Sequence, residues 1–84
     1  MGICIITFRS VTPAQRAERL LKNVGLSCNM GRTPRWMEQQ GCGYSLRVRF
    51  ADAETVAALL RSNKVAFRKI YLQRENGNLE ELEL

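Results

Sequence analysis

The 84-residue sequence predicts an α+β fold, because segments with strand character and segments with helical character alternate along it. Two strand-like segments, 3–8 and 44–50, are each followed by a segment with helical periodicity. At this length we expect one domain, which buries only about 60% of the surface that its unfolded chain exposes. No apolar run reaches the roughly 18 residues of a membrane span, so we expect no contact with a membrane.

The first half predicts a buried strand and an amphipathic helix. The run ICIITF, residues 3–8, is continuously apolar and rich in β-branched residues, which is typical of a strand buried on both faces. Thr12 is a suitable N-cap and Pro13 suits a first helical position. We therefore expect a helix over 13–23, followed by a short strand over 26–30.

The segment 44–50 has the alternation of a half-exposed strand. Its even positions are apolar and should face the helices, whereas Ser45, Arg47 and Arg49 should lie on the open face. The connection before it, GRTPRWMEQQGCG over 31–43, is longer than an ordinary hairpin loop. Loops of this length often carry function.

A second helix and a last strand complete the pattern. Asp52 can cap a helix over 53–62, and 66–72 has the composition of a strand. The order predicts the ferredoxin-like βαββαβ fold, a four-stranded antiparallel sheet with two helices on one face. We expect this domain to span 1–73 and 74–84 to form a solvated acidic C-terminal tail.

Charge is distributed unevenly along the chain. Residues 1–74 contain all 13 lysines and arginines but only four acids, a net charge of +9. Residues 75–84 contain four glutamates and no base, a net charge of −4. A basic domain favours an acidic partner, which can be nucleic acid, an anionic ligand or an acidic protein surface.

Three cysteines and the absence of histidine restrict the chemistry. Without histidine there is no Ser-His-Asp or Cys-His catalysis and no histidine-containing zinc site. The spacing of Cys4, Cys28 and Cys42 matches no metal motif, and no secretory signal precedes them, so we expect reduced thiols, a cytoplasmic location and no metal or cofactor. Cys4 stands in an apolar run and should pack in the core. Cys28 alternates with Leu26 and Met30 and should pack in the core or at an edge.

Cys42 stands between Gly41 and Gly43, and this arrangement has two interpretations. The glycines remove neighbouring side chains and would present the thiol to a partner, while a nearby cation would lower its pKa. Alternatively, the stretch is a turn or bulge in which cysteine is a small apolar filler. The candidate cations are Arg32, Arg35 and Arg47.

The loop residues before Cys42 also have two interpretations each. Pro34 could stiffen the loop so that Arg35 faces the thiol, or the pair could be an ordinary solvated turn. Trp36 could contact a partner protein if it is exposed, or cap the small core if it is buried.

Three features of the sequence occur in a specific order. They are the opening IITF at 5–8, the pair Pro34-Arg35 in the long loop, and Cys42-Gly43 before a strand. In this order, and over about residues 4–72, the chain resembles the small selenium/sulfur carrier-like proteins. The resemblance implies that Cys42 carries sulfur or selenium as a persulfide or selenide. The loop sequence WMEQQ departs from the family pattern, and the acidic tail lies outside it.

Together these observations favour a sulfur or selenium carrier that is not itself an enzyme. A donor protein, such as a cysteine desulfurase, would pass a sulfane atom to Cys42, and an acceptor protein would remove it. Gly41 and Gly43 would present the thiol, and Arg35 and Arg47 would stabilise the anion.

Two other functions stay open. Arg47 and Arg49 beside Tyr44 allow a nucleic-acid-binding sheet, but the stretch lacks the further aromatic residues of an RNA-recognition strand, so nucleic acid is the less favoured partner. A small dimeric interaction domain without chemistry is the other alternative. The first strand is apolar on both faces, and an uncovered apolar sheet face often pairs with a second copy.

Overall fold

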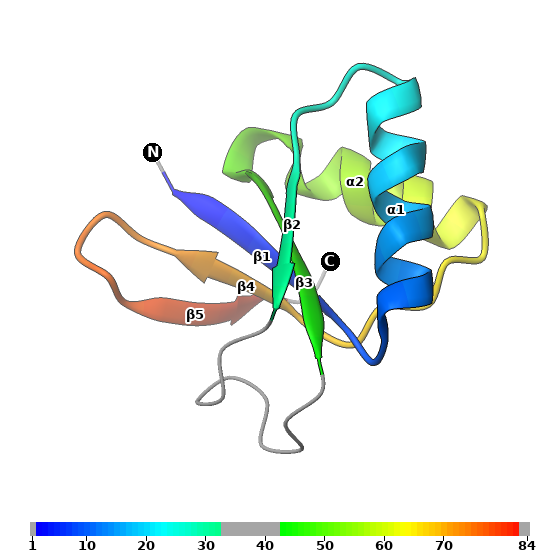
Figure 1. The fold of residues 1–84 in the computed structure, drawn as a ribbon. Coiled ribbons are helices and arrows are strands. Elements are labelled where there is room, and N and C mark those ends of the chain that lie inside the picture. The colour runs from blue at the N-terminus through cyan, green and yellow to red at the C-terminus, as the bar shows by residue number, and fades with distance from the viewer. Residues whose placement is uncertain (1, 33–42, 83–84) are drawn as a thin grey trace.

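The computed structural model describes residues 2–32 and 43–82, which form a sheet and a layer of two helices (Figure 1). A short 3-10 turn, η1, leads into the second helix. In chain order the elements are β1 (Ile3–Phe8), α1 (Val11–Asn23), β2 (Asn29–Arg32), β3 (Tyr44–Arg49), η1 (Phe50–Asp52), α2 (Ala53–Ser62), β4 (Ile70–Gln73) and β5 (Leu79–Leu82).

The sheet has five strands in the order β2-β3-β1-β4-β5, and every neighbouring pair is antiparallel. The first four strands have the order of a ferredoxin-like sheet, which confirms the predicted α+β class. The prediction of four strands is wrong by one, because part of the acidic segment pairs with β4. Gly77 has a φ of 87° in the turn between β4 and β5 and reverses the chain there.

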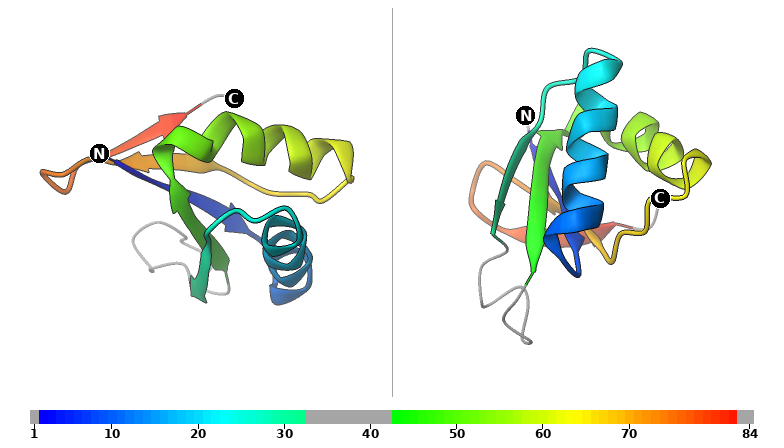
Figure 2. Two further views of the ribbon diagram at one scale, coloured as in Figure 1. Left: turned by 90° about the horizontal axis from the view of Figure 1, so that it is seen from above. Right: turned by 45° about the vertical axis from the view of Figure 1, so that its right-hand side comes forward.

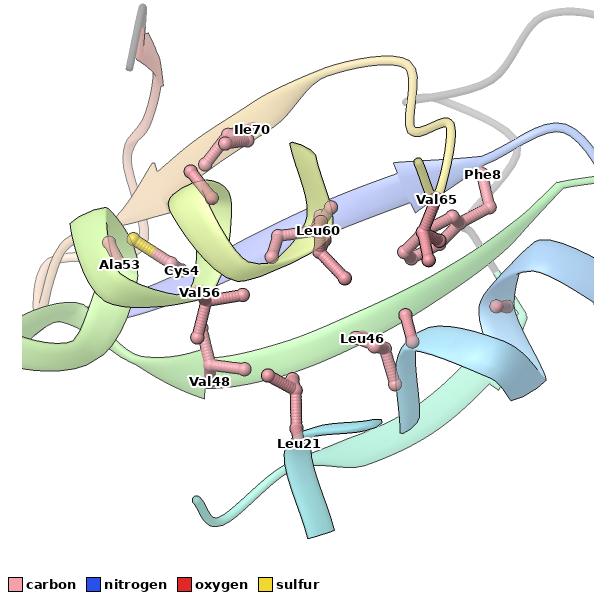
Figure 3. Packing of buried hydrophobic residues seen from close by; sticks show 14 of the residues in the cluster. Cys4, Phe8, Leu21, Leu46, Val48, Ala53, Val56, Leu60, Val65 and Ile70 are labelled. Atoms are coloured by element: carbon pink, nitrogen blue, oxygen red, sulfur yellow. The ribbon is translucent and has the colours of Figure 1, made fainter. Parts of the chain in front are cut away.

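Strand β1 lies in the centre of the sheet and has apolar side chains on both faces, as its composition predicts. Cys4, Ile6 and Phe8 are fully buried in the core cluster beneath the helices (Figure 3). Leu21 of α1 and Leu60 of α2 belong to the same cluster. Both helices therefore cover one face of the sheet, α1 beside β2 and β3 and α2 on the side of β4 (Figure 2).

Both helices end in the same hydrogen-bonded motif. After α1, the N–H of Leu26 donates to the carbonyl of Leu21, and that of Gly25 donates to Lys22. After α2, the N–H of Val65 donates to Leu60, and that of Lys64 donates to Arg61. These are Schellman pairs of bonds, which need a left-handed residue just past the helix. Gly25 and Lys64 occupy that position with φ values of 81° and 57°.

The predicted helix starts are correct to within two residues. Helix α1 begins at Val11 with Ser10 as N-cap, so Thr12 is not the N-cap. Helix α2 begins after Asp52 as predicted, although the Asp52 side chain makes no capping bond. Its carboxylate instead accepts a hydrogen bond from Arg49 Nε at 3.1 Å.

Two predicted strands are displaced towards the C-terminus. Strand β2 spans Asn29–Arg32 rather than 26–30, because Leu26 closes the Schellman motif of α1. Strand β4 spans Ile70–Gln73 rather than 66–72, because Val65 closes the motif of α2. Leu26 is a residue that the sequence pattern assigns to the following strand, whereas Val65 directly precedes the predicted strand 66–72.

Candidate functional site

Two of the three cysteines lie in the described part of the chain, and neither has the environment of a reactive thiol. Cys4, the second residue of β1, is 0% exposed, and burial raises its pKa. The predicted core role of Cys4 is confirmed. A thiol with a raised pKa is protonated near neutral pH and is a poor nucleophile.

Cys28 lies immediately before β2 and is half-buried against the core cluster. Burial raises the pKa of its thiol, the nearby Glu18 carboxylate raises it further, and Lys22 lowers it. Its S–H donates a long hydrogen bond to the Glu18 backbone carbonyl at 3.9 Å. This arrangement holds the thiol in its protonated form.

The proposed carrier residue and most of its loop lie outside the described residues. These are Pro34, Arg35, Trp36, Gly41 and Cys42. Gly43 is described, is buried, and leads directly into β3. The peptide bond between Cys42 and Gly43 therefore attaches the predicted carrier cysteine to the residue before β3.

The described residues at this end of the sheet are basic. Tyr44, the first residue of β3, pairs with Phe8 of β1 and with Arg32 of β2. The Arg32 guanidinium lies 6.0 Å from the centre of the Tyr44 ring. Arg9 directly follows Phe8 and is exposed. Two arginines thus lie at the ends of the strands that flank the beginning of β3, Arg32 as the last residue of β2 and Arg9 directly after β1.

The N-terminus of α1 is at the same end of the molecule. The helix begins at Val11, three residues after the last residue of β1. Figure 1 shows the start of α1, the end of β2 and the start of β3 together at the lower end of the sheet. A helix N-terminus and arginine side chains both favour an anion, and both lower the pKa of a cysteine close to them.

Arg47 lies further from this end than its place in the sequence indicates. It is four residues beyond Gly43 along an extended strand, a separation of about 13 Å. Its side chain is exposed on the open face of the sheet. Among the described arginines, Arg9 and Arg32 are therefore closer to the start of β3 than Arg47 is.

Sequence reasoning included Arg32 among the candidate cations and missed Arg9. Arg9 could have been identified from the antiparallel pairing of β1 with β3, because this pairing brings the end of β1 to the start of β3. The same pairing separates Cys28 from Gly43. Asn29, the neighbour of Cys28, pairs with Arg47, which lies four residues beyond Gly43 along β3.

The open face of the sheet is less basic than the sequence indicates. Arg47 and Arg49 are exposed there as predicted, but Ser45 is buried. Arg49 pairs with Asp52, and Lys69 pairs with Glu81 of β5 at 3.5 Å. Tyr44 is on the helix side with Phe8, so β3 offers no aromatic platform for bases.

Comparison with known protein families assigns the chain to one family. The family described as "Putative Se/S carrier protein-like" matches residues 3–72. The chain belongs to this Se/S carrier-like family. The match begins at the first residue of β1 and ends within β4, so β5 lies beyond it.

Other comparisons add no relative. No curated protein and no solved structure matches the chain. Within residues 2–32 and 43–82, no group of three or more histidine, cysteine or acidic side chains could hold a metal ion. No helix in that part of the chain has the length and hydropathy needed to cross a membrane.

Proposed function

We propose that this Se/S carrier-like protein relays a sulfane sulfur or selenium atom on Cys42. The thiolate of Cys42 attacks the terminal sulfur of a donor persulfide, such as that of a cysteine desulfurase. A new S–S bond forms at Cys42, the donor's S–S bond breaks, and the donor cysteine leaves as a thiolate. An acceptor thiolate then attacks the outer sulfur and regenerates Cys42, so each transfer is redox-neutral.

The observation that supports Cys42 most directly is the state of the other two cysteines. Cys4 is fully buried and Cys28 is held protonated by burial and by Glu18. A carrier needs a thiol that can ionise and reach the active site of another protein. Neither described cysteine meets that requirement, and the description of the matching family supports a carrier role.

The charges around the start of β3 support an anionic form of the carrier. Arg9 and Arg32 are exposed at the ends of the neighbouring strands, and the N-terminus of α1 is at the same end. They would stabilise the thiolate and the persulfide anion by Coulombic attraction. Arg35 would share this role, and the lack of side chains at Gly41 and Gly43 would ease the approach of a partner protein to Cys42. Arg47 would contact the partner protein instead, because it lies about 13 Å from Gly43 along β3.

The protein would not turn over a small substrate by itself. It would need a donor and an acceptor, and both reactions would occur in complexes with other proteins. This proposal predicts one labelled sulfur per chain, bound to a single cysteine.

The test is transfer of ³⁵S from labelled cysteine through a purified cysteine desulfurase. We expect Cys42→Ser to lose the label. Cys28→Ser is the matched control, because it removes a partly exposed thiol by the same substitution, and it should retain the label. Intact mass should show the increment of one sulfur atom, which a reductant removes. Labelling of Cys42→Ser at the wild-type level, or loss of label only in Cys28→Ser, contradicts the assignment.

A further inference from the structure

A shallow groove lies between α1 and the end of α2. It is lined by residues of one face of α1 and by two residues just past α2, namely Arg16, Arg19, Leu20, Asn23, Asn63 and Val65. Its volume is about 260 Å³, below the roughly 300–1,000 Å³ of pockets that take small molecules. The groove therefore has room for a few side chains of another protein rather than for a whole metabolite.

The two arginines on the α1 side of the groove are uncompensated. Arg16 and Arg19 are exposed, and neither makes an ion pair with any residue of 2–32 and 43–82. Residues three apart on a helix are neighbours, so their like charges repel each other. Glu18 does not offset them, because its carboxylate pairs with Lys22 at 3.7 Å. The groove therefore attracts negatively charged groups.

The groove also offers apolar and amide groups. Leu20 is half-buried against the core cluster and Val65 is 6% exposed, so part of the lining is apolar. The Asn63 side chain donates to the Leu59 carbonyl at 2.9 Å, which leaves its own amide oxygen as an acceptor. Apolar side chains bordered by arginine and amide groups have the composition of a protein interface.

We propose that this groove docks an acidic amphipathic helix of a partner protein. Arg16 and Asn23 are two turns of α1 apart, about 10 Å along the helix axis. A second helix repeats its side chains with the same rise. It can therefore set carboxylates against both arginines and an apolar side chain against Leu20.

A second copy of this chain is a poor source of the acidic helix. Most of the acidic side chains in the described part of the chain already have partners there. The ion pairs are Glu18–Lys22, Asp52–Arg49, Glu80–Arg74 and Glu81–Lys69. A second copy would have to give up its own ion pairs to compensate the arginines of the groove. The carboxylates must therefore come from a different protein.

The lining of the groove favours a protein over a nucleic acid. Phosphates would be attracted to Arg16 and Arg19 but would leave Leu20 and Val65 without an apolar contact. None of the described residues that line the groove is aromatic, so it has no surface on which a base can stack. An amphipathic helix uses the charged and the apolar parts together.

The groove is near the end of the sheet where Gly43 leads to Cys42. Arg16 is five residues past Val11, the first residue of α1, or about 8 Å along the axis. The start of α1 and the start of β3 lie together at that end (Figure 1). Under the proposed function, the docked helix belongs to the sulfur donor and holds the donor's active site near Cys42. This last step rests on the proposed function, whereas the docking itself does not.

Binding of a synthetic helix tests the docking directly. The probe is an amphipathic peptide of about 15 residues, with a row of leucines flanked by glutamates. It would be titrated into the ¹⁵N-labelled full chain in the Cys42→Ser background and followed by two-dimensional NMR. We expect saturable shift changes at 16–23 and 63–65. The double variant Arg16→Glu with Arg19→Glu should raise the Kd at least ~10-fold.

The matched control is Arg47→Glu. Arg47 is also exposed and unpaired with any residue of 2–32 and 43–82, but it lies on the other face of the sheet from the helices. At ~0.15 M salt charges are screened over about 8 Å, so this variant should leave the Kd unchanged. Two further peptides separate the contributions: replacing every glutamate by glutamine, or every leucine by alanine, should each weaken binding. Circular dichroism would verify that each variant is folded.

A peptide that causes no saturable shift change in the groove residues overturns the proposal. An unchanged Kd in the double variant, or an equal loss of affinity in Arg47→Glu, also overturns it. If the peptide does not bind and the double variant instead weakens binding of a labelled single-stranded RNA, the groove serves a nucleic acid. Because the background lacks Cys42, these outcomes are independent of the carrier function, which the ³⁵S transfer experiment tests separately.

Discussion

At the scale of single residues, the environments of the cysteines separate structural thiols from the proposed carrier. Cys4 is enclosed by the core, and Cys28 is half-buried beside the acidic Glu18. The burial of Cys4 was predictable, because it stands in a run that is apolar on both faces. The environment of Cys28 was not, because Glu18 is ten residues away and reaches it only through the packing of α1.

Neutralising Glu18 should make Cys28 more reactive. Glu18→Gln removes a charge that raises the pKa of the Cys28 thiol, so the thiolate appears at lower pH. In the wild type, alkylation of Cys28 should become fast only above the ordinary pH range of a free thiol. We expect roughly a two-fold faster alkylation at pH 8 in Glu18→Gln.

The measurement is alkylation against pH, with peptide mapping of each cysteine. Lys22→Gln is the matched control, because Lys22 lowers the same pKa and its loss should slow the reaction. Equal rates in both variants would show that these charges do not control Cys28. Cys4 should stay unmodified in every folded variant.

At the scale of elements, the two helices end in the same motif with different residues. The left-handed position after α1 is Gly25, whereas after α2 it is Lys64. A side chain in that conformation costs about 1–2 kcal/mol, and glycine avoids this cost. Asn63 partly compensates, because its side-chain amide donates to the Leu59 carbonyl at 2.9 Å.

Lys64→Gly should therefore stabilise the protein. We expect the free energy of unfolding to rise by about 0.5–1 kcal/mol, since the relief of strain exceeds the extra entropy of glycine in the unfolded chain. The converse variant Gly25→Ala should lower it by about 1 kcal/mol. No atom lies within 4 Å of an added Cβ at Gly25, so the effect reports conformation and not a clash.

Urea unfolding monitored by circular dichroism measures both changes. Gly31→Ala is the control, because Gly31 has no positive φ and an added Cβ there also meets open space. Gly31→Ala should be neutral or stabilise by up to about 1 kcal/mol, because alanine has less backbone entropy to lose on folding. A destabilised Lys64→Gly would mean that the Lys64 side chain contributes more than its backbone strain costs.

At the scale of the whole molecule, the acidic segment is part of the sheet. Strand β5 covers the edge of β4, and Leu82 packs against the core cluster. Glu80 and Glu81 pair with Arg74 and Lys69, one on each face of the sheet. The segment therefore neutralises part of the basic domain. Exposed pairs of this kind contribute little to stability, so pairing of the strand and burial of Leu82 carry most of its effect.

Ending the chain after Gln73 tests this role. The truncated protein keeps the segment that matches the family but exposes the edge of β4. We expect a lower urea midpoint and more self-association at the exposed edge, measured by unfolding curves and light scattering. An unchanged midpoint would mean that β5 contributes nothing to folding. The charge variant Glu80→Gln, which keeps the strand, should shift the midpoint only slightly.

The sequence by itself determined the α+β class, the order of the first four strands, both helices and the burial of Cys4. These features follow from local periodicity and from helix-end residues, and both signals come from residues that are close together in the sequence. Only the tertiary structure decided the fifth strand, the left-handed Lys64, the raised pKa of Cys28 and the placement of Arg9, Arg32 and Arg47 relative to Gly43. The conformation of Lys64 follows from the hydrogen bonds that end α2. The other three depend on pairing or packing between distant segments, and the energy of those contacts outweighs local preference.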